Sequence, residues 1–226
     1  MKPLPALIGQ IQCTIERSKS GFDRLWPKYT LSLSQGNRYM LTGKKRGMNS
    51  TSNYMVTIDQ QKFSKDANGY LGKVRSNFLG TEFSIFDSKE NPKKGKSDAR
   101  AHLGCVQYET NVLGSKGPRR MKVLLPLVNR DGEETEWPDT ENEAETIQGK
   151  FAQNENEDIM WFFNKPPKWN EQVQAFVLNF NGRVDKASVK NFQLVDDHDD
   201  SKIYMQFGRV GKDIFNMDCA FPFSIF

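Results

Sequence analysis

The sequence predicts a mainly antiparallel β protein, either a sandwich or a barrel, formed as one domain over residues 1–226. Three observations lead to this prediction. Apolar and polar residues alternate in many short segments, helical periodicity is scarce, and clusters of Gly, Asn and Asp separate the segments. Many short strands at such spacing are typical of sandwiches and barrels.

The expected strands recur along most of the chain. In YTLSLS, Leu31 and Leu33 share a face. In NYMVTI, the alternation places Tyr54 toward the core and Asn53 on the outer side. The segments expected to form strands are residues 29–34, 53–58, 70–78, 81–86, 121–128, 175–180 and 203–210.

The segment GYLGKVRSN carries two cations within an expected strand. Lys73 and Arg75 stand two positions apart, so their side chains point to the same face, followed there by Asn77. Phe78 is expected to serve the core. The alternation of core-facing residues along this strand shifts by one position close to Gly72, which predicts a β-bulge near that residue.

Helices and loops are expected in four places. Short helices are predicted at 186–192 and near 101–106. The basic, breaker-rich stretch 87–100 is predicted to be a loop. The stretch 131–158, with eleven acidic residues and one lysine, is predicted to be a mobile, solvated acidic insertion.

The composition is that of an ordinary soluble protein, with 37% hydrophobic and 27% charged residues. The apolar runs are far shorter than the ~20 residues that a membrane helix needs. The first residues lack the apolar core of a signal peptide. Synthesis in the cytosol is therefore expected, and any membrane contact should be peripheral.

Charge is divided unevenly along the chain. Residues 1–130 carry 23 Lys and Arg against 9 Asp and Glu, whereas residues 131–226 carry 9 against 19. The resulting charges, +14 and −10, suggest an anionic partner for the first part. The alternative is that the two sets of charges interleave when the chain folds.

The residues that usually perform catalysis or bind metals do not form a known pattern. Cys13, Cys105 and Cys219 are far apart and never occur as CxxC, so neither a disulfide framework nor a zinc site is expected. His102 lies three residues before Cys105, and His198 lies in an acidic turn. The sequence therefore predicts no enzyme, metal or cofactor.

The basic residues instead suggest an anion-binding patch. A hairpin of 53–58 with 70–78 would gather Asn53, Lys73 and Arg75 on one exterior surface. Arginine forms bidentate bonds with phosphate, lysine supplies a compact charge, and an Asn amide orients a hydroxyl or phosphate. The alternative is that these cations are merely solvated. Further basic residues nearby are Lys44, Lys45, Arg46 and Arg100.

Several long motifs resemble one known family. They are, in order, TSNYMVTID, YLGKVRSNFLGTEFSIFD, YETNVLGSKGPRRMKVLLP, WNEQVQAFVLNFNGRVDKASVKNFQLV and MQFGRVGKDIFNMDCAFPFSIF. Together they resemble the carboxy-terminal domain of the tubby and tubby-like proteins, over about residues 8–226. The resemblance implies a closed, mainly antiparallel β-barrel around a central apolar helix.

The resemblance also implies a function. Tubby domains bind phosphatidylinositol 4,5-bisphosphate at the inner plasma-membrane leaflet and act as peripheral adaptors, including in delivery of receptors to cilia. Some members have been proposed as transcription regulators. The headgroup contacts of the family correspond here to Asn53, Lys73, Arg75 and Arg100. A cytoplasmic and inner plasma-membrane location, with the cilium or nucleus as further sites, is what the resemblance implies. A monomer is expected.

Two departures from the family qualify these expectations. The family domain continues past FPFSIF into the helix that fills the barrel, and this chain stops before that helix. A domain truncated at its C-terminal end, with an apolar lumen, is therefore expected; the alternative is that another segment of the chain fills the barrel. Longer members also carry an N-terminal extension with motifs for ciliary transport, and a role through that extension does not carry over.

Three functions are compatible with the sequence. The first is a non-enzymatic phosphoinositide-binding module with membrane-receptor cargo. The second is a DNA-binding transcription regulator, because a basic groove also neutralises backbone phosphates. The third is an interaction scaffold whose acidic stretch 131–158 binds a basic partner.

Overall fold

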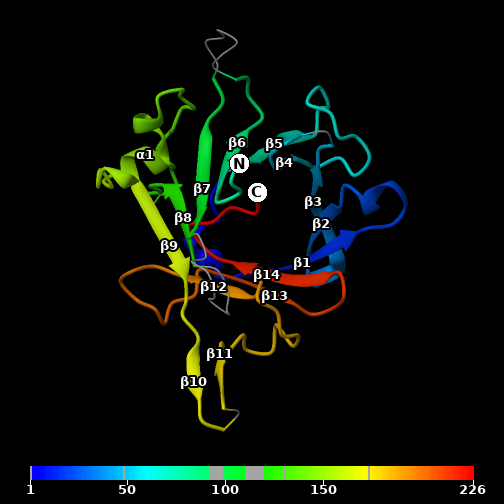
Figure 1. Ribbon diagram of the computed structural model, residues 1–226, viewed down its shortest axis with the longest axis vertical. Helices are drawn as coiled ribbons and strands as arrows, with labels where there is room; N and C mark the ends of the chain where they lie inside the picture. Colours follow the sequence, from blue (N-terminus) through cyan, green and yellow to red (C-terminus); the bar gives the residue numbers. More distant parts are fainter. Residues whose placement is uncertain (1, 48, 92–98, 110–119, 130, 173) are drawn as a thin grey trace.

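The computed structural model in Figure 1 describes residues 2–47, 49–91, 99–109, 120–129, 131–172 and 174–226. In these ranges twelve strands close into one barrel, in the order β1-β14-β13-β12-β9-β8-β7-β6-β5-β4-β3-β2, while β10 and β11 pair separately. Every neighbouring pair is antiparallel. The predicted mainly β fold is therefore confirmed, as a barrel.

Most of the chain lies in short strands joined by turns. The strands are β1 (Ile11–Ser18), β2 (Lys28–Leu33), β3 (Arg38–Lys45), β4 (Asn53–Thr57), β5 (Tyr70–Ser76), β6 (Glu82–Asp87), β7 (His102–Tyr108), β8 (Met121–Pro126), β9 (Ile159–Asn164), β10 (Lys168–Asn170), β11 (Ala175–Val177), β12 (Phe192–Val195), β13 (Met205–Arg209) and β14 (Ile214–Cys219). The helical segments are the 3-10 turns η1 (Ala6–Ile8), η2 (Gly21–Arg24), η3 (Gln35–Asn37) and η5 (Glu143–Glu145), and the helix α1 (Ile147–Ala152).

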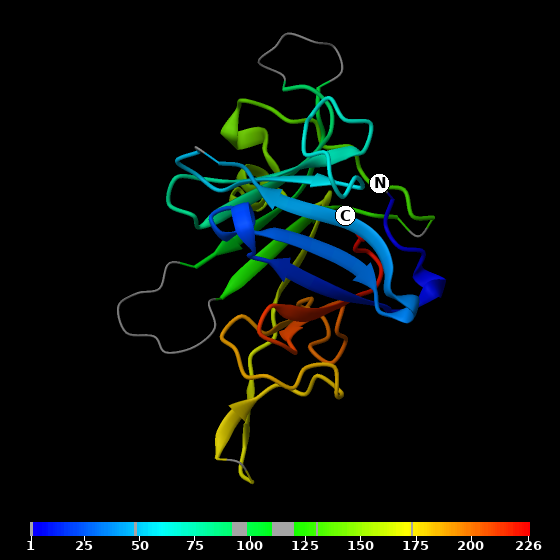
Figure 2. The same ribbon diagram turned by 90° about the vertical axis from the view of Figure 1, so that its right-hand side faces the viewer.

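Consecutive strands run up and down, so alternate connections lie at the same end of the barrel. The connections β1–β2, β3–β4, β5–β6 and β13–β14 share one end, which we call the turn end. The connections β2–β3, β4–β5, β6–β7 and β8–β9 lie at the opposite end, together with the first residues of β1. Figure 2 shows the adjacent strands β1 to β5 side by side in the wall of the barrel.

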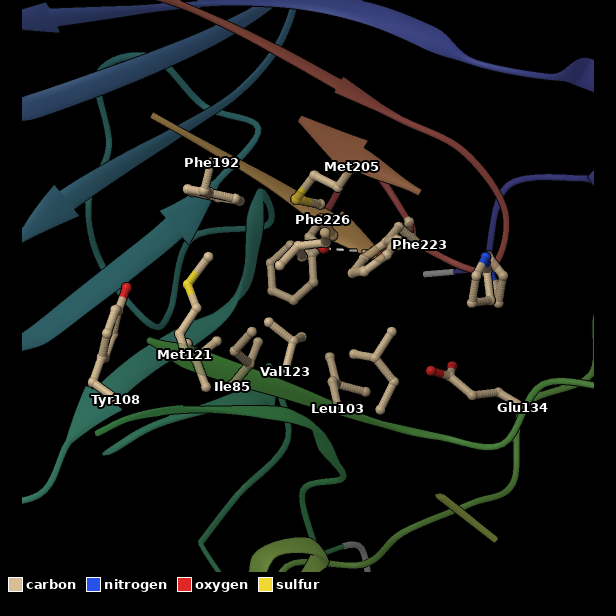
Figure 3. A pocket seen from close by; sticks show the side chains of 16 residues that line it. Ile85, Leu103, Tyr108, Met121, Val123, Glu134, Phe192, Met205, Phe223 and Phe226 are labelled. Carbon is tan, nitrogen blue, oxygen red and sulfur yellow. Dashed lines mark hydrogen bonds between the residues drawn. The ribbon is translucent and has the colours of Figure 1, made fainter. Parts of the chain in front are cut away.

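The lumen is apolar and partly filled by the last residues of the chain. The segment that follows β14 enters the ring of strands, where the Phe223 ring lies 4.9 Å from that of Phe162. The amide of Leu4 donates to the Phe223 carbonyl at 3.0 Å, so the first residues of the chain also cover the lumen at the end of the barrel opposite the turn end. A cavity of about 260 Å³ remains, with Phe226 among its lining side chains (Figure 3).

Both predicted helices are wrong. Residues 102–108 form β7, paired with β6 and β8. Residues 186–191 are irregular, because Asn191 donates to the carbonyl of Lys186 and accepts from the amide of Arg209. Such bonds between polar side chains and the backbone compete with helical bonding.

The acidic stretch 131–158 is not wholly loop, which corrects that part of the prediction. Thr146 caps α1 by accepting from the Gly149 amide at 3.1 Å. Ile147 is fully buried in a cluster with Cys105 and Leu124. Because Ile147 is a single buried apolar residue in a stretch of many acidic ones, the sequence shows little of the apolar periodicity that predicts a helix. This explains why α1 was missed. The mobility of the stretch stays a prediction.

The strand β5 shows both a confirmed and a wrong prediction. The register with β4 shifts between Gly72 and Tyr70, so a bulge lies where it was expected. The strand ends at Ser76, however, and Phe78 is exposed in the next turn instead of packing in the core. Residues 92–98 of the predicted basic loop lie outside the described residues. In the described ranges, no helix has the length and apolarity to cross a bilayer.

Candidate functional site

Three of the predicted site residues share the outer wall of the barrel. Asn53 of β4 pairs directly with Arg75 of β5, and Met55 pairs with Lys73. This face is the outer one, because the alternate pair Val74 and Ile85 faces inward, where Ile85 lines the lumen cavity. The hairpin predicted from the sequence therefore brings Asn53, Lys73 and Arg75 together.

Lys73 is a buried cation surrounded by other cations. Its exposed fraction is 8%, and its Nζ lies 5.7 Å from the centre of the Phe86 ring. Burial, and then the charges of Arg100, Lys65 and Arg75, lower the pKa of Lys73 to about 8. Among the described residues, no carboxylate forms an ion pair with Lys73. The charge of Asp139 opposes the lowering but contributes least, so the charged form is only partly compensated.

Arg100 contacts the same aromatic ring as Lys73. Its exposed fraction is 5%, and its Cζ is 4.1 Å from the centre of the Phe86 ring. The backbone of Arg100 is fixed, since its amide donates to the Glu90 carbonyl and its carbonyl accepts from the Asp139 amide, both at 2.9 Å. Arg100 thus stands on an ordered segment, close to the residues of β4 and β5.

The guanidinium of Arg100 is only partly engaged. Its Nε is in ion-pair contact with Oδ2 of Asp139 at 2.6 Å. The buried Nη1 of Arg100 and Oδ1 of Asn53 have no hydrogen-bond partner among the described residues. Buried polar groups are normally satisfied, so these two atoms are available to a bound ligand or to water.

The three further basic residues at the end of β3 are separated by the structure. Arg46 donates its amide to the Asn53 carbonyl at 2.8 Å and so adjoins the site. The Lys44 ammonium is engaged elsewhere, 3.0 Å from Asp23 Oδ1 and over the Phe63 ring. Lys45 pairs with Tyr54, so it belongs to the opposite face of the wall.

Lys65 is a member of the site that sequence reasoning missed. It lies in the β4–β5 connection, and its charge lowers the pKa of Lys73, which places it nearby. Nothing in the polar stretch around Lys65 signals this proximity, because the distance between a loop residue and a strand residue is set by the tertiary structure. We call Asn53, Lys65, Lys73, Arg75 and Arg100 the cationic site.

The arrangement suits a multiply charged anion. It combines a guanidinium with unused donors, a compact ammonium and an amide on rigid strands. An anion bound there would restore the charged form of Lys73 and supply partners to the buried donors. Depressed lysine pKa values of this kind are frequent at functional sites.

The histidine and the nearby cysteine are not arranged for catalysis. Burial lowers the pKa of His102 to about 4, and its ring stacks on Phe86 at 5.0 Å. Burial also raises the pKa of the Cys105 thiol. Both groups are therefore neutral at physiological pH, and a neutral thiol is a poor nucleophile. In the described ranges, no group of His, Cys, Asp and Glu is placed to hold a metal ion.

Comparison with known proteins gives consistent relatives. The model of the Tub family matches residues 1–226. The chain is 42% identical to Tubby-related protein 3 of Mus musculus over 94% of this chain and 48% of that protein. It is 41% identical to Tubby-related protein 2 of Homo sapiens (97% and 44%) and to Protein king tubby of Drosophila grimshawi (98% and 50%). The chain thus spans about half the length of these relatives.

Proposed function

Because the chain belongs to the Tub family, we propose that it is a non-enzymatic module that binds phosphatidylinositol 4,5-bisphosphate through the cationic site. In this proposal the protein is a peripheral adaptor at the inner face of the plasma membrane. Receptor cargo and ciliary delivery are functions that the family resemblance suggests for such an adaptor.

The observation that carries the proposal is the environment of Lys73. A buried ammonium with a pKa near 8, beside an arginine with unused donors, is unfavourable until an anion arrives. Two negative phosphate groups would relieve the repulsion among Lys73, Arg75 and Arg100. The site is therefore prepared for phosphate at the expense of the stability of the unliganded fold.

The spacing of the cations favours more than one phosphate. Lys73 and Arg75 are two residues apart on one strand face, which corresponds to roughly 7 Å along the strand. Arg100 approaches from a separate segment. Neighbouring phosphates on one inositol ring can then contact different cations, with Asn53 placed to orient a hydroxyl or phosphate.

Sedimentation with vesicles tests the proposal. Wild-type protein should bind vesicles that contain phosphatidylinositol 4,5-bisphosphate, and the double variant Lys73→Ala/Arg75→Ala should not. The control Lys186→Ala/Lys190→Ala removes the same charge from exposed residues and should bind as wild type does. Equal binding by the site variant, or tighter binding of duplex DNA than of vesicles at physiological salt, would overturn the proposal.

A further inference from the structure

We propose that the turn formed by Phe78 and Leu79, which we call the apolar tip, inserts into the interfacial region of the bilayer while the cationic site holds a lipid headgroup. The inference rests on the proposed function and adds a second membrane contact to it. Phe78 and Leu79 are 84% and 76% exposed. Leu7 and Ile8 form a second adjacent exposed pair, at 101% and 58%, so it is the position of the apolar tip beside the cationic site that distinguishes it.

The apolar tip is held in a defined conformation. Asn77 Oδ1 accepts from the Thr81 amide at 3.0 Å, and Asn77 Nδ2 donates to Thr81 Oγ1 at 3.0 Å. The Asn77 amide also donates to the Glu82 carbonyl at 3.0 Å, and the Gly80 amide donates to Asn77. The turn therefore presents its two apolar side chains without a large further loss of backbone entropy on insertion.

The apolar tip continues directly from the cationic site. Arg75 and Asn53 form the last residue pair of β4 and β5 before the turn, and the exposed Arg46 is bonded to Asn53. At a membrane interface the charged headgroups lie outside the apolar acyl chains. Cations placed to contact the headgroups, with apolar side chains placed beyond them, match this order of polarity. This charge arrangement favours an anionic bilayer over an uncharged apolar partner.

A neighbouring turn extends the same surface. Leu25, between β1 and β2, is also exposed at the turn end. The next residue, Trp26, packs against Gly47 of the β3–β4 turn, because a Cβ at Gly47 would lie 2.9 Å from the Trp26 ring. Leu25 and Arg46 are thus carried by turns in contact with each other, and Leu25 is a second candidate for insertion.

The test compares two double variants. Phe78→Ser/Leu79→Ser removes the apolar tip, and the matched control Leu7→Ser/Ile8→Ser removes two adjacent exposed apolar side chains at the opposite end of the barrel. Binding is measured by calorimetry with soluble inositol 1,4,5-trisphosphate and by sedimentation with vesicles containing phosphatidylinositol 4,5-bisphosphate. Loss of two inserted side chains should weaken vesicle binding by roughly 10- to 100-fold.

A depth measurement completes the experiment. In the Leu79→Cys variant, an environment-sensitive dye can be attached selectively, because Cys13, Cys105 and Cys219 are fully buried. Its fluorescence should be quenched by lipids that carry bromine on their acyl chains.

The outcomes separate the two proposals. The inference is supported if the tip variant keeps its affinity for the soluble headgroup within about twofold, loses vesicle binding, and the dye is quenched. Unchanged vesicle binding by the tip variant, or absence of quenching, overturns the insertion and leaves the headgroup site standing. Failure of the wild-type protein to bind the soluble headgroup overturns both proposals.

Discussion

Replacement of Lys73 by methionine should stabilise the unliganded protein and abolish binding of the phosphoinositide. The pKa of Lys73 is lowered from 10.5 to about 8, chiefly by burial. One pKa unit corresponds to about 1.4 kcal/mol, so the charged ammonium destabilises the fold by at most about 3.5 kcal/mol at pH 7. We expect Lys73→Met to raise the free energy of unfolding by roughly 1–3 kcal/mol, because methionine fills similar volume without charge.

The pH dependence gives the prediction its sign. Between about pH 8 and pH 10.5 the unfolded chain holds a proton on Lys73 that the folded protein has released, so the penalty disappears as the pH rises. The advantage of Lys73→Met should therefore be full below pH 8 and close to zero above pH 10.5. Taking the difference between the variant and the wild type removes contributions from tyrosines and cysteines that titrate in the same range.

Urea unfolding at several pH values, followed by tryptophan fluorescence, measures this difference. The control Lys168→Met changes an exposed lysine on β10 and should leave stability unchanged within about 0.5 kcal/mol at each pH. Headgroup affinity, measured alongside, should fall about tenfold per pH unit above pH 8 in the wild type, because the bound Lys73 must be charged. A destabilised Lys73→Met variant whose difference from wild type does not vary with pH would refute this reasoning.

Three further substitutions test the framework of the fold. Arg183→Ala should destabilise the protein by about 3–5 kcal/mol, because it leaves the fully buried carboxylate of Asp218 without its ion pair at 2.6 Å; a loss below 1 kcal/mol in urea unfolding would contradict this. Gly72→Ala should lower the unfolding free energy by more than ~2 kcal/mol, since its Cβ would lie 2.1 Å from the Phe86 carbonyl oxygen; thermal unfolding unchanged from wild type would show that the bulge relaxes. Ile147→Ala should lower the free energy of unfolding by about 2–5 kcal/mol, because it leaves a cavity where this buried side chain of α1 packs. Unchanged stability would contradict this and would indicate that residues 131–158 form a loop without tertiary contacts.

Local patterns in the sequence determined the strands and much of the site. Alternation identified the segments that became β2, β4 and β8, and the slipped parity at Gly72 identified the bulge in β5. The i, i+2 spacing of Lys73 and Arg75 fixed a common face, because strand geometry has a period of two. The pairing register of β4 with β5 depended only on a hairpin between strands close in the sequence, which is why Asn53 could be placed beside Lys73 and Arg75.

Contacts distant in the sequence could not be obtained in this way. Three features depend on how loops close over the barrel. They are the effect of the Lys65 charge on Lys73, the fixing of Arg100 by Glu90 and Asp139, and the separation of Arg46 from Lys44. The exposure of Phe78 was also missed, since an apolar residue next to a strand has the same local signature inside or outside it.

The sequence by itself determined that this protein is an antiparallel β structure of the Tub family with Asn53, Lys73 and Arg75 on one face of the sheet. Only the tertiary structure decided that Lys73 is buried among cations and that an apolar turn continues from them. The physical reason is that side-chain direction follows from the local backbone, whereas burial and pKa follow from every chain segment that folds against the site.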